Sequence, residues 1–265
     1  MKNERRMSVA GIDVGAVSAK AVVLREDKIA GSAILPTGYD VAKVAKEVGG
    51  LALAQAQLQM DDLRYVVGTG YGRRAIPFAN EVITEITCHA RGATSVIPEA
   101  RTIIDIGGQD SKAIRVDAKG NVVDFIMNDK CAAGTGRFLE VMSRALELSI
   151  EEFSSLSRMG PNPCKISSTC TVFAESEIVS LRAENKSRED IIAGLYRSIA
   201  SRVGAMVKQI GCEDVVVFTG GVAKNKALLR ALEEEIGHRI LVPGEPQIMG
   251  ALGAALIAAR RNHCE

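Results

Sequence analysis

The 265-residue sequence predicts a mixed α/β protein with two lobes, built on a duplicated strand–turn–strand unit. The segment MSVAGIDVGAVSAKAVVLRE, at 7–26, has β-branched residues on both sides of a glycine turn. The segment ARTIIDIGGQDSKAIRVD, at 100–117, repeats that pattern, which indicates an internal duplication. Amphipathic helical segments surround both units, and a hydrophobic content of 47% is enough to fill a substantial core.

The remaining elements follow from the spacing of apolar residues, which recur three and four positions apart in helices. We expect helices at 40–59, 136–148 and 187–210, and the last begins at Ser187 with acidic residues in its first turn. Toward the C-terminus we expect, in order, a strand at 214–221, a helix at 222–237, a short strand at 239–242 and a small-residue helix at 248–261.

The two lobes are expected to divide the chain near its first third. The first lobe would span 1–97 and carry the first hairpin, and helix 248–261 would pack back on it. The second lobe would span 98–247 and carry the second hairpin. Because no low-complexity linker separates them, we expect the lobes to be packed together and hinged.

Charge and the N-terminus exclude several classes of function. Lys and Arg number 33 against 32 Asp and Glu, so no global field favours nucleic acid or an anionic membrane. The N-terminal segment lacks the apolar core of a signal peptide and the length of a membrane span, which predicts a cytoplasmic protein. In a reducing compartment the six cysteines are not expected to form disulfides.

Each glycine turn combines backbone amides that can approach phosphate oxygens with a carboxylate that can hold Mg²⁺. The candidate residues of the first turn are Asp13, Gly15, Ser18 and Lys20, and those of the second are Asp105, Gly107, Gly108, Gln109, Asp110 and Lys112. A third glycine pair, Gly220 and Gly221, ends the strand segment 214–221, with Asn225 one helical turn further on, and could contact a flat ring. The segment GTGYGRR at 68–74 fails the spacing of a dinucleotide loop and is interpreted as a turn.

These motifs resemble the superfamily of actin, sugar kinases and heat-shock chaperone ATPases. The resemblance spans nearly the whole chain and implies a two-lobed actin-like ATPase fold with duplicated ribonuclease H-like lobes. It also implies binding of ATP or ADP with Mg²⁺.

Two cysteines are predicted to lie at the starts of helices, Cys131 before GRFLEVMSRALEL and Cys170 before TVFAESEIVSL. The unpaired amides and positive dipole end of a helix favour a thiolate, which is the form that binds metals. Two sulfurs are too few for a structural zinc or an iron–sulfur cluster, but a symmetric dimer would supply four. A cluster within one chain, held by four cysteines, stays open as an alternative; those cysteines are Cys88, Cys131, Cys164 and Cys170. We expect packing roles for Cys88 with its neighbour His89, and no chemistry from Cys212 or Cys264.

The segments NDKCAAGTGRFLE, SSTCTVFAESE, DIGGQD and TGGVAKN together resemble the activator components of 2-hydroxyacyl-CoA dehydratases. The wider family includes ATPase subunits of benzoyl-CoA reductase. The resemblance implies a homodimer bridged by one [4Fe–4S] cluster at Cys131 and Cys170, with ATP in each protomer. It also implies an electron donor, ferredoxin or flavodoxin, and a partner dehydratase or reductase that receives the electron.

In this hypothesis ATP binding and hydrolysis move the lobes and drive electron transfer. Asp13 and Asp105 would organise Mg²⁺ and the attacking water, Lys20 or Lys112 would neutralise phosphate charge, and Gln109 would orient the water. No general base is identified. The alternatives are a benzoyl-CoA reductase-type subunit, a small-molecule kinase of the same fold, and a nucleotide-dependent scaffold with a structural zinc.

Overall fold

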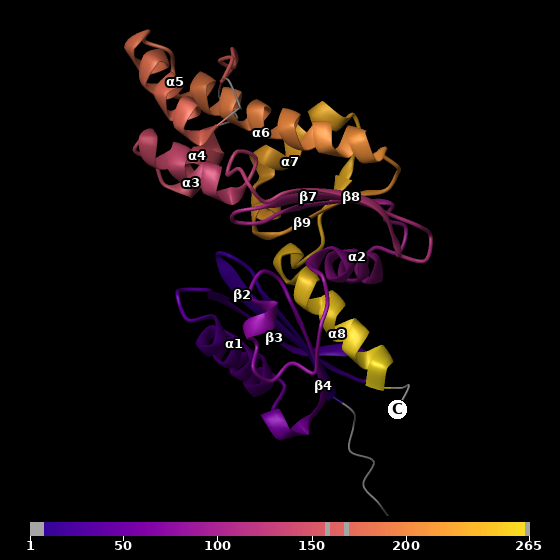
Figure 1. Cartoon of the computed structure of the whole chain (residues 1–265). Coiled ribbons are helices and arrows are strands. Elements are labelled where there is room, and N and C mark those ends of the chain that lie inside the picture. The colour runs from indigo at the N-terminus through magenta and orange to yellow at the C-terminus, as the bar shows by residue number, and fades with distance from the viewer. Residues whose placement is uncertain (1–7, 157–159, 167–169, 263–265) are drawn as a thin grey trace, which may run out of the picture. The chain divides into compact units, whose positions relative to one another are not determined.

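The chain folds into two units, each with a five-stranded sheet and packed helices (Figure 1). Unit 1 comprises the chain up to Glu99, Val116–Val122 and the chain from Pro243 onward, and unit 2 comprises Ala100–Arg115 and Val123–Val242. The computed structural model describes residues 8–156, 160–166 and 170–262.

The sheet of unit 1 has the strand order β3-β2-β1-β4-β5. Strand β1 is antiparallel to β2 and parallel to β4. The hairpin turn between β1 and β2 and the carboxyl end of β4 therefore lie at the same edge of the sheet. The strands are β1 (Ser8–Val14), β2 (Ser18–Arg25), β3 (Lys28–Pro36), β4 (Leu63–Thr69) and β5 (Glu81–Val82).

Helices cover both faces of this sheet. Helix α1 (Val41–Gln55) packs on β2 and β3, while α8 (Met249–Asn262) packs on β1 and β4 and is itself covered by α2 (Glu85–Val96). Strand β1 alternates between two hydrophobic clusters: Ile12 belongs to the cluster with α1, and Val9 to the cluster with α8. Short 3₁₀ turns lie at Met60–Asp62, Arg73–Ala75 and Pro246–Ile248.

The sheet of unit 2 has the order β10-β9-β6-β7-β8, which is the same topology as that of unit 1. Strand β6 is antiparallel to β7 and parallel to β9, as β1 is to β2 and β4. The strands are β6 (Thr102–Ile106), β7 (Ser111–Val116), β8 (Val122–Asn128), β9 (Val216–Thr219) and β10 (Ile240–Leu241). The duplication predicted from the sequence therefore extends to sheet order and strand direction.

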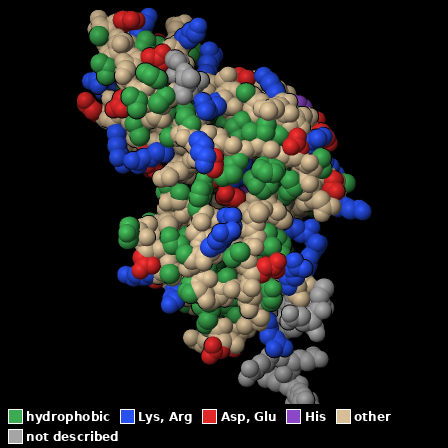
Figure 2. Space-filling view, viewed as in Figure 1, with side chains coloured by type: hydrophobic (Ala, Val, Ile, Leu, Met, Phe, Trp, Pro, Cys, Tyr) green, Lys and Arg blue, Asp and Glu red, His purple; other side chains and the backbone are tan. Residues whose placement is uncertain are grey.

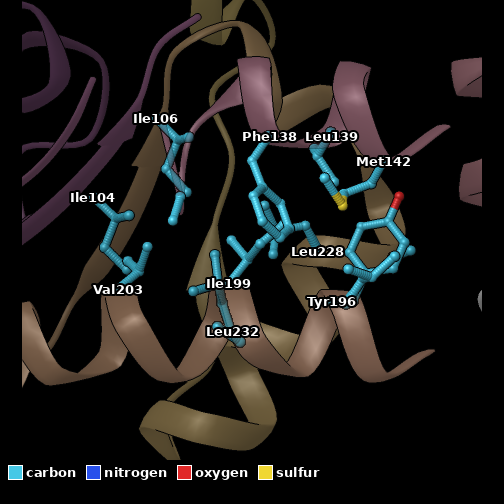
Figure 3. Close-up of a cluster of buried hydrophobic side chains, with 14 of the residues drawn as sticks. Ile104, Ile106, Phe138, Leu139, Met142, Tyr196, Ile199, Val203, Leu228 and Leu232 are labelled. Atoms are coloured by element: carbon cyan, nitrogen blue, oxygen red, sulfur yellow. The ribbon is translucent and has the colours of Figure 1, made fainter. Parts of the chain in front are cut away.

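The helices of unit 2 enclose a single large hydrophobic cluster. In Figure 3, Phe138 and Met142 of α3 lie with Ile199 of α6 and Leu228 of α7 in one packed core. The helices are α3 (Gly136–Ala145), α4 (Ile150–Leu156), α5 (Thr171–Ala183), α6 (Arg188–Ile210) and α7 (Lys226–Ile236).

Capping residues mark several of the helix boundaries. Asp40 accepts a hydrogen bond from the Lys43 amide at the start of α1, and Ser187 does the same for α6. Gly211 and Gly237, both with positive φ, end α6 and α7. The expected helix at 222–237 is divided, because Asn225 has φ −84° and ψ 102° and caps a new helix after the 3₁₀ turn Gly221–Lys224.

The predicted fold class is confirmed, because both units are α/β and share one topology. The helix expected at 40–59 ends earlier, at Gln55, and the strand expected at 214–221 contracts to β9. Among the described residues, no helix is long and apolar enough to cross a membrane.

Candidate functional site: two carboxylate hairpins and a pair of thiols

The first hairpin pairs Asp13 with Lys20 across the ladder between β1 and β2. The Lys20 Nζ lies 3.3 Å from Asp13 Oδ2, and the carboxylate is buried. The Gly15 amide donates to the Ser18 carbonyl at 3.1 Å, which closes the turn. A Cβ on Gly15 would lie 3.3 Å from the Lys20 amine, so glycine leaves this space for the cation.

The second hairpin repeats this arrangement in unit 2. Asp105 pairs with Lys112 across the β6–β7 ladder, and the Lys112 Nζ lies 3.1 Å from Asp105 Oδ2. The Gly107 amide donates to the Asp110 carbonyl at 2.9 Å, as Gly15 does to Ser18. Lys112 also lies 2.6 Å from Asp110 Oδ2, so this single cation lies between two carboxylates.

The two hairpins differ in charge balance and access. In unit 2 the buried lysine and two carboxylates sum to one negative charge, whereas the Asp13–Lys20 pair is neutral. A buried excess negative charge with hard oxygen donors suits a divalent cation such as Mg²⁺. Lys112 is 1% exposed and held by carboxylates, so the partly buried Lys20 is the lysine better able to contact a phosphate. Gln109 is exposed at the tip of its turn, next to Gly108.

A glycine turn lies over each carboxylate, at the end of the neighbouring parallel strand. Thr69 is paired with Asp13 and is followed by Gly70 (φ +86°); Thr219 is paired with Asp105 and is followed by Gly220 (φ +89°). A Cβ on Gly70 would lie 2.5 Å from Asp13 Oδ1, and one on Gly220 would lie 2.9 Å from Asp105 Oδ1. Both turns therefore require glycine.

The segment at 68–74, interpreted from the sequence as a plain turn, is thus the unit 1 counterpart of the glycine pair at 220–221. The sequence did contain a signal for this equivalence. If the duplication of the hairpins is extended along the chain, Thr69-Gly70 aligns with Thr219-Gly220.

Asn225, a candidate for nucleotide binding, has a structural role in this conformation. Its Oδ1 accepts hydrogen bonds from the amides of Ala227 and Leu228 at the start of α7. Its Nδ2 donates to the hydroxyl of Tyr196 at 2.7 Å, and burial raises the pKa of that hydroxyl. A role for Asn225, Gly220 or Gly221 in binding adenosine stays a prediction.

The two candidate cluster cysteines both lie in unit 2 and are partly buried, and neither forms a disulfide with another described cysteine. Cys170 is the N-cap of α5, as predicted. α3 begins at Gly136, as predicted, so Cys131 lies five residues before the helix and is not its N-cap, which is Thr135. The intervening residues form a turn in which Gly134 has φ +88°.

The Cys131 turn is held in place by hydrogen bonds at both of its ends. The Asn128 side chain at the end of β8 donates to the carbonyls of Cys131 and Ala133, at 2.8 and 3.1 Å. At the other end, the amides of Gly136 and Arg137 donate to the carbonyls of Gly107 and Gly108, at 2.9 and 2.7 Å. The first turn of α3 is therefore attached directly to the second hairpin.

The other described cysteines are packing residues. Cys88 is fully buried, and burial, with the nearby Asp13 charge adding to it, raises the pKa of its thiol to about 12. Burial also raises the pKa of the thiols of Cys164 and Cys212. Within the described ranges, no three His, Cys, Asp or Glu side chains gather as a metal site, so the single-chain cluster finds no support. Cys264 lies outside the described residues.

The surface beside Cys170 is apolar. Val172, Phe173 and Val179 of α5 are each more than 60% exposed. Figure 2 shows hydrophobic side chains on the surface around this helix, while charges of both signs are interspersed over the rest of the face drawn. An exposed apolar surface of this kind is typical of a contact with another protein.

The chain is similar over nearly its full length to activator proteins. It is 46% identical to a 2-hydroxyisocaproyl-CoA dehydratase activator of Clostridioides difficile, with 95% of each chain covered. It is 47% identical to an activator of lactoyl-CoA dehydratase of Anaerotignum propionicum, over 95% of this chain and 97% of the relative. A benzoyl-CoA reductase subunit of Thauera aromatica is 35% identical, over 96% of this chain and 93% of that relative.

Solved structures agree with this similarity. Component A of the Acidaminococcus fermentans (R)-2-hydroxyglutaryl-CoA dehydratase superposes with a TM-score of 0.92 at 40% identity, over 97% of this chain and 99% of that one. The Clostridium difficile 2-hydroxyisocaproyl-CoA dehydratase activator with bound ADPNP superposes with a TM-score of 0.90 at 45% identity, over 97% and 96%. A ROK family glucokinase of Streptomyces griseus, at 12% identity, a TM-score of 0.63 and 96% and 99% coverage, shares the fold alone.

A profile of the BadF/BadG/BcrA/BcrD ATPase family matches residues 10–258, and the resemblance predicted from the motifs is confirmed. The chain belongs to the BadF/BadG/BcrA/BcrD ATPase family.

Proposed function

We propose that this protein is the ATP-hydrolysing activator of a 2-hydroxyacyl-CoA dehydratase, and that it delivers single electrons through a [4Fe–4S] cluster shared by two copies of the chain. The observation that carries the proposal is the attachment of the Cys131 turn to the second carboxylate hairpin by two backbone hydrogen bonds. This connects a thiol with metal-binding chemistry to a motif with phosphate-binding chemistry. The relatives named as dehydratase activators support the same function.

Both hairpins would bind the phosphates of Mg²⁺·ATP. Asp13 and Asp105 supply hard carboxylate oxygens for Mg²⁺, and the glycine turns leave backbone amides open to phosphate oxygens. Lys20 would neutralise phosphate charge, while Lys112 would hold Asp105 and Asp110 in position. Units 1 and 2 would correspond to the two lobes expected at 1–97 and 98–247.

Cys131 and Cys170 would hold the cluster, and the residues present fit it. Both thiols are partly buried, and among the described residues neither is taken up by a disulfide or enclosed in the core. Two thiolates per chain give four in a two-fold symmetric dimer, which is the number that a [4Fe–4S] cluster takes. When bound, the cluster supplies one-electron redox chemistry. The exposed apolar residues of α5, next to Cys170, suit a surface covered by protein.

The hydrogen bonds from Gly136 and Arg137 would couple the two functions. A shift of the hairpin carbonyls on binding or hydrolysis of ATP changes the position of the first turn of α3. Because Asn128 fixes the Cys131 carbonyl on the other side, the turn between these anchors would carry the displacement to the thiol. The protein would act in the cytoplasm under anaerobic conditions, with ferredoxin or flavodoxin as donor.

A second candidate function is that of an ATPase subunit of a benzoyl-CoA reductase, which the 35% identity to the Thauera aromatica protein favours. In both candidates the chain would use ATP and a cluster, and they differ in the enzyme that accepts the electron. A small-molecule kinase shares only the fold with this chain.

Reconstitution with the candidate acceptors tests the proposal. The anaerobically purified protein, a reduced ferredoxin and ATP are mixed with a 2-hydroxyacyl-CoA dehydratase component or with a benzoyl-CoA reductase core, and product formation is measured. We expect ATP-dependent activation of the dehydratase, and its loss in Cys131→Ser. Activation of the reductase alone would favour the second candidate, and ATP hydrolysis that activates neither would contradict both.

A further inference from the structure

Asp13 has a second neighbour that its position in the hairpin does not reveal. On one side its Oδ2 lies 3.3 Å from the Lys20 amine. On the other side, Asp13 lies against Gly250 of α8. A Cβ added to Gly250 would lie 3.0 Å from Asp13 Oδ2 and 2.9 Å from His89 Nε2. The imidazole of His89 on α2 and the carboxylate of Asp13 on β1 therefore both lie against the same glycine.

The helices hold His89 in this position. The Gly92 Cα of α2 lies directly against the Met249 carbonyl of α8, and Gly253 of α8 lies against the Cys88 carbonyl of α2. With backbones in contact on both sides of it, the imidazole has little freedom to move, and His89 is only 6% exposed. Besides burial, the Asp13 charge contributes to the raised pKa of the Cys88 thiol, which places this part of α2 within the electrostatic reach of the carboxylate.

The second hairpin, which contains Asp105 in unit 2, indicates the role of the His89 imidazole. There the Thr219 hydroxyl donates to Asp105 Oδ1 at 2.9 Å, so the carboxylate has an uncharged donor besides Lys112. The equivalent Thr69 hydroxyl makes no such bond to Asp13 and faces the Cys88 thiol. In unit 1 the imidazole of His89 lies beside the carboxylate instead.

We propose that His89 is a positioning residue of the nucleotide site: its Nε2–H donates to the Asp13 carboxylate and holds it in the orientation in which it serves Mg²⁺·nucleotide. The inference rests on the proposed function of Asp13. Hydrogen bonds of this kind orient metal-binding carboxylates, and their loss costs about 10- to 100-fold in metal affinity. His89 itself does not touch the nucleotide in this account.

Two substitutions separate this role from simple packing. In His89→Gln the amide nitrogen reaches the position of Nε2 and can still donate, whereas in His89→Asn the amide reaches only as far as Nδ1. Binding of ADP is measured by calorimetry with and without Mg²⁺ for the full chain purified anaerobically. We expect His89→Asn to weaken binding in Mg²⁺ about 10- to 100-fold, to leave Mg²⁺-free binding unchanged, and to be rescued by His89→Gln.

Cys88→Ala is the matched control, because Cys88 is the adjacent buried residue of α2 and its thiol is not a ligand. It should lower the thermal stability without changing the affinity for Mg²⁺·ADP. Equal affinities of His89→Asn and wild type would overturn the inference, and so would equal losses in His89→Asn and His89→Gln. A loss of ADP affinity in His89→Asn that is equally large without Mg²⁺ would also overturn the inference. A wild type that binds no nucleotide would overturn the proposed function as well.

Discussion

The substitution Gly136→Ala tests the link between the second hairpin and the Cys131 turn. A Cβ at this position would lie 3.2 Å from the Gly107 carbonyl oxygen, 3.2 Å from Val222 Cγ2 and 3.3 Å from the Gly108 Cα. These contacts are tighter than side chains normally make, so α3 must move away from the hairpin by a few tenths of an ångström. The movement lengthens both hydrogen bonds of the link, which measure 2.9 and 2.7 Å.

Gly136→Ala should have a small effect on the stability of the fold and a large effect on the coupling between the second hairpin and the Cys131 turn. Weakening two backbone hydrogen bonds costs up to about 2 kcal/mol, and replacing glycine by alanine returns about 0.4–1 kcal/mol by restricting the unfolded chain. The net loss of about 1 kcal/mol leaves a domain of ordinary stability, about 5–15 kcal/mol, folded. The coupling free energy between two sites is typically about 1–3 kcal/mol, which corresponds to about a 5- to 150-fold change in affinity. A loss of about 1 kcal/mol in the hydrogen bonds of the link is therefore enough to remove much of the coupling.

Hydrogen–deuterium exchange measured by mass spectrometry is the assay. In the wild type, exchange in peptides covering 128–145 should differ between the ADP and ADPNP states. In Gly136→Ala this difference should vanish, although nucleotide still protects the hairpin at 105–112. The control is Gly50→Ala in α1, where a Cβ would meet nothing within 4 Å. An unchanged nucleotide response of 128–145 in Gly136→Ala would refute the link.

Three further predictions concern the hairpins and the core. Lys112→Met removes the cation between two buried carboxylates and should lower the free energy of chemical unfolding by about 3–5 kcal/mol. The control Lys43→Met breaks only an exposed ion pair and should change the free energy of unfolding by less than about 0.5 kcal/mol. Equal effects of the two substitutions would contradict the argument from burial. Gln109→Ala should slow single-turnover ATP hydrolysis about 100-fold if the exposed amide orients the water, and an unchanged rate would remove Gln109 from the mechanism. Because the folded Cys88 thiol has a pKa of about 12 against 9.0 when unperturbed, only the unfolded thiol ionises between these pH values. The thiol's contribution to stability is therefore complete below pH 9 and is lost progressively as the pH rises from 9 toward 12, by about a factor of ten in the folding equilibrium per pH unit. Cys88→Ala should lack this slope, and identical pH profiles would show the assignment to be wrong.

Local sequence patterns predicted the fold class and the two hairpins that contain the candidate carboxylates. The alternation around Gly15 and Gly107 predicts two hairpins, and their repetition predicts the shared topology, because the pattern depends only on neighbours in the chain. The same spacing fixes the Asp–Lys cross-strand pairs at Asp13 and Asp105. The cysteines stand out since thiols near helix starts are chemically distinctive, although a turn with Gly134 at positive φ separates Cys131 from α3.

The parts that could not be predicted depend on contacts between distant segments. His89 reaches Asp13 only because Gly92, Gly250 and Gly253 bring α2 and α8 into backbone contact, and nothing near EITCHARGA in the sequence indicates this. The capping role of Asn225 depends on Tyr196, which is 29 residues away. The attachment of Gly136 to Gly107 likewise joins two motifs that look unrelated in the sequence.

Iron and sulfide content per pair of chains, measured on protein purified without oxygen, decides whether Cys131 and Cys170 hold a shared cluster. We expect a dimer with about four iron and four sulfide ions per two chains, and loss of this cluster in both Cys131→Ser and Cys170→Ser, while Cys164→Ser retains it. Protein without iron and sulfide, or a cluster that survives replacement of both Cys131 and Cys170, would contradict it.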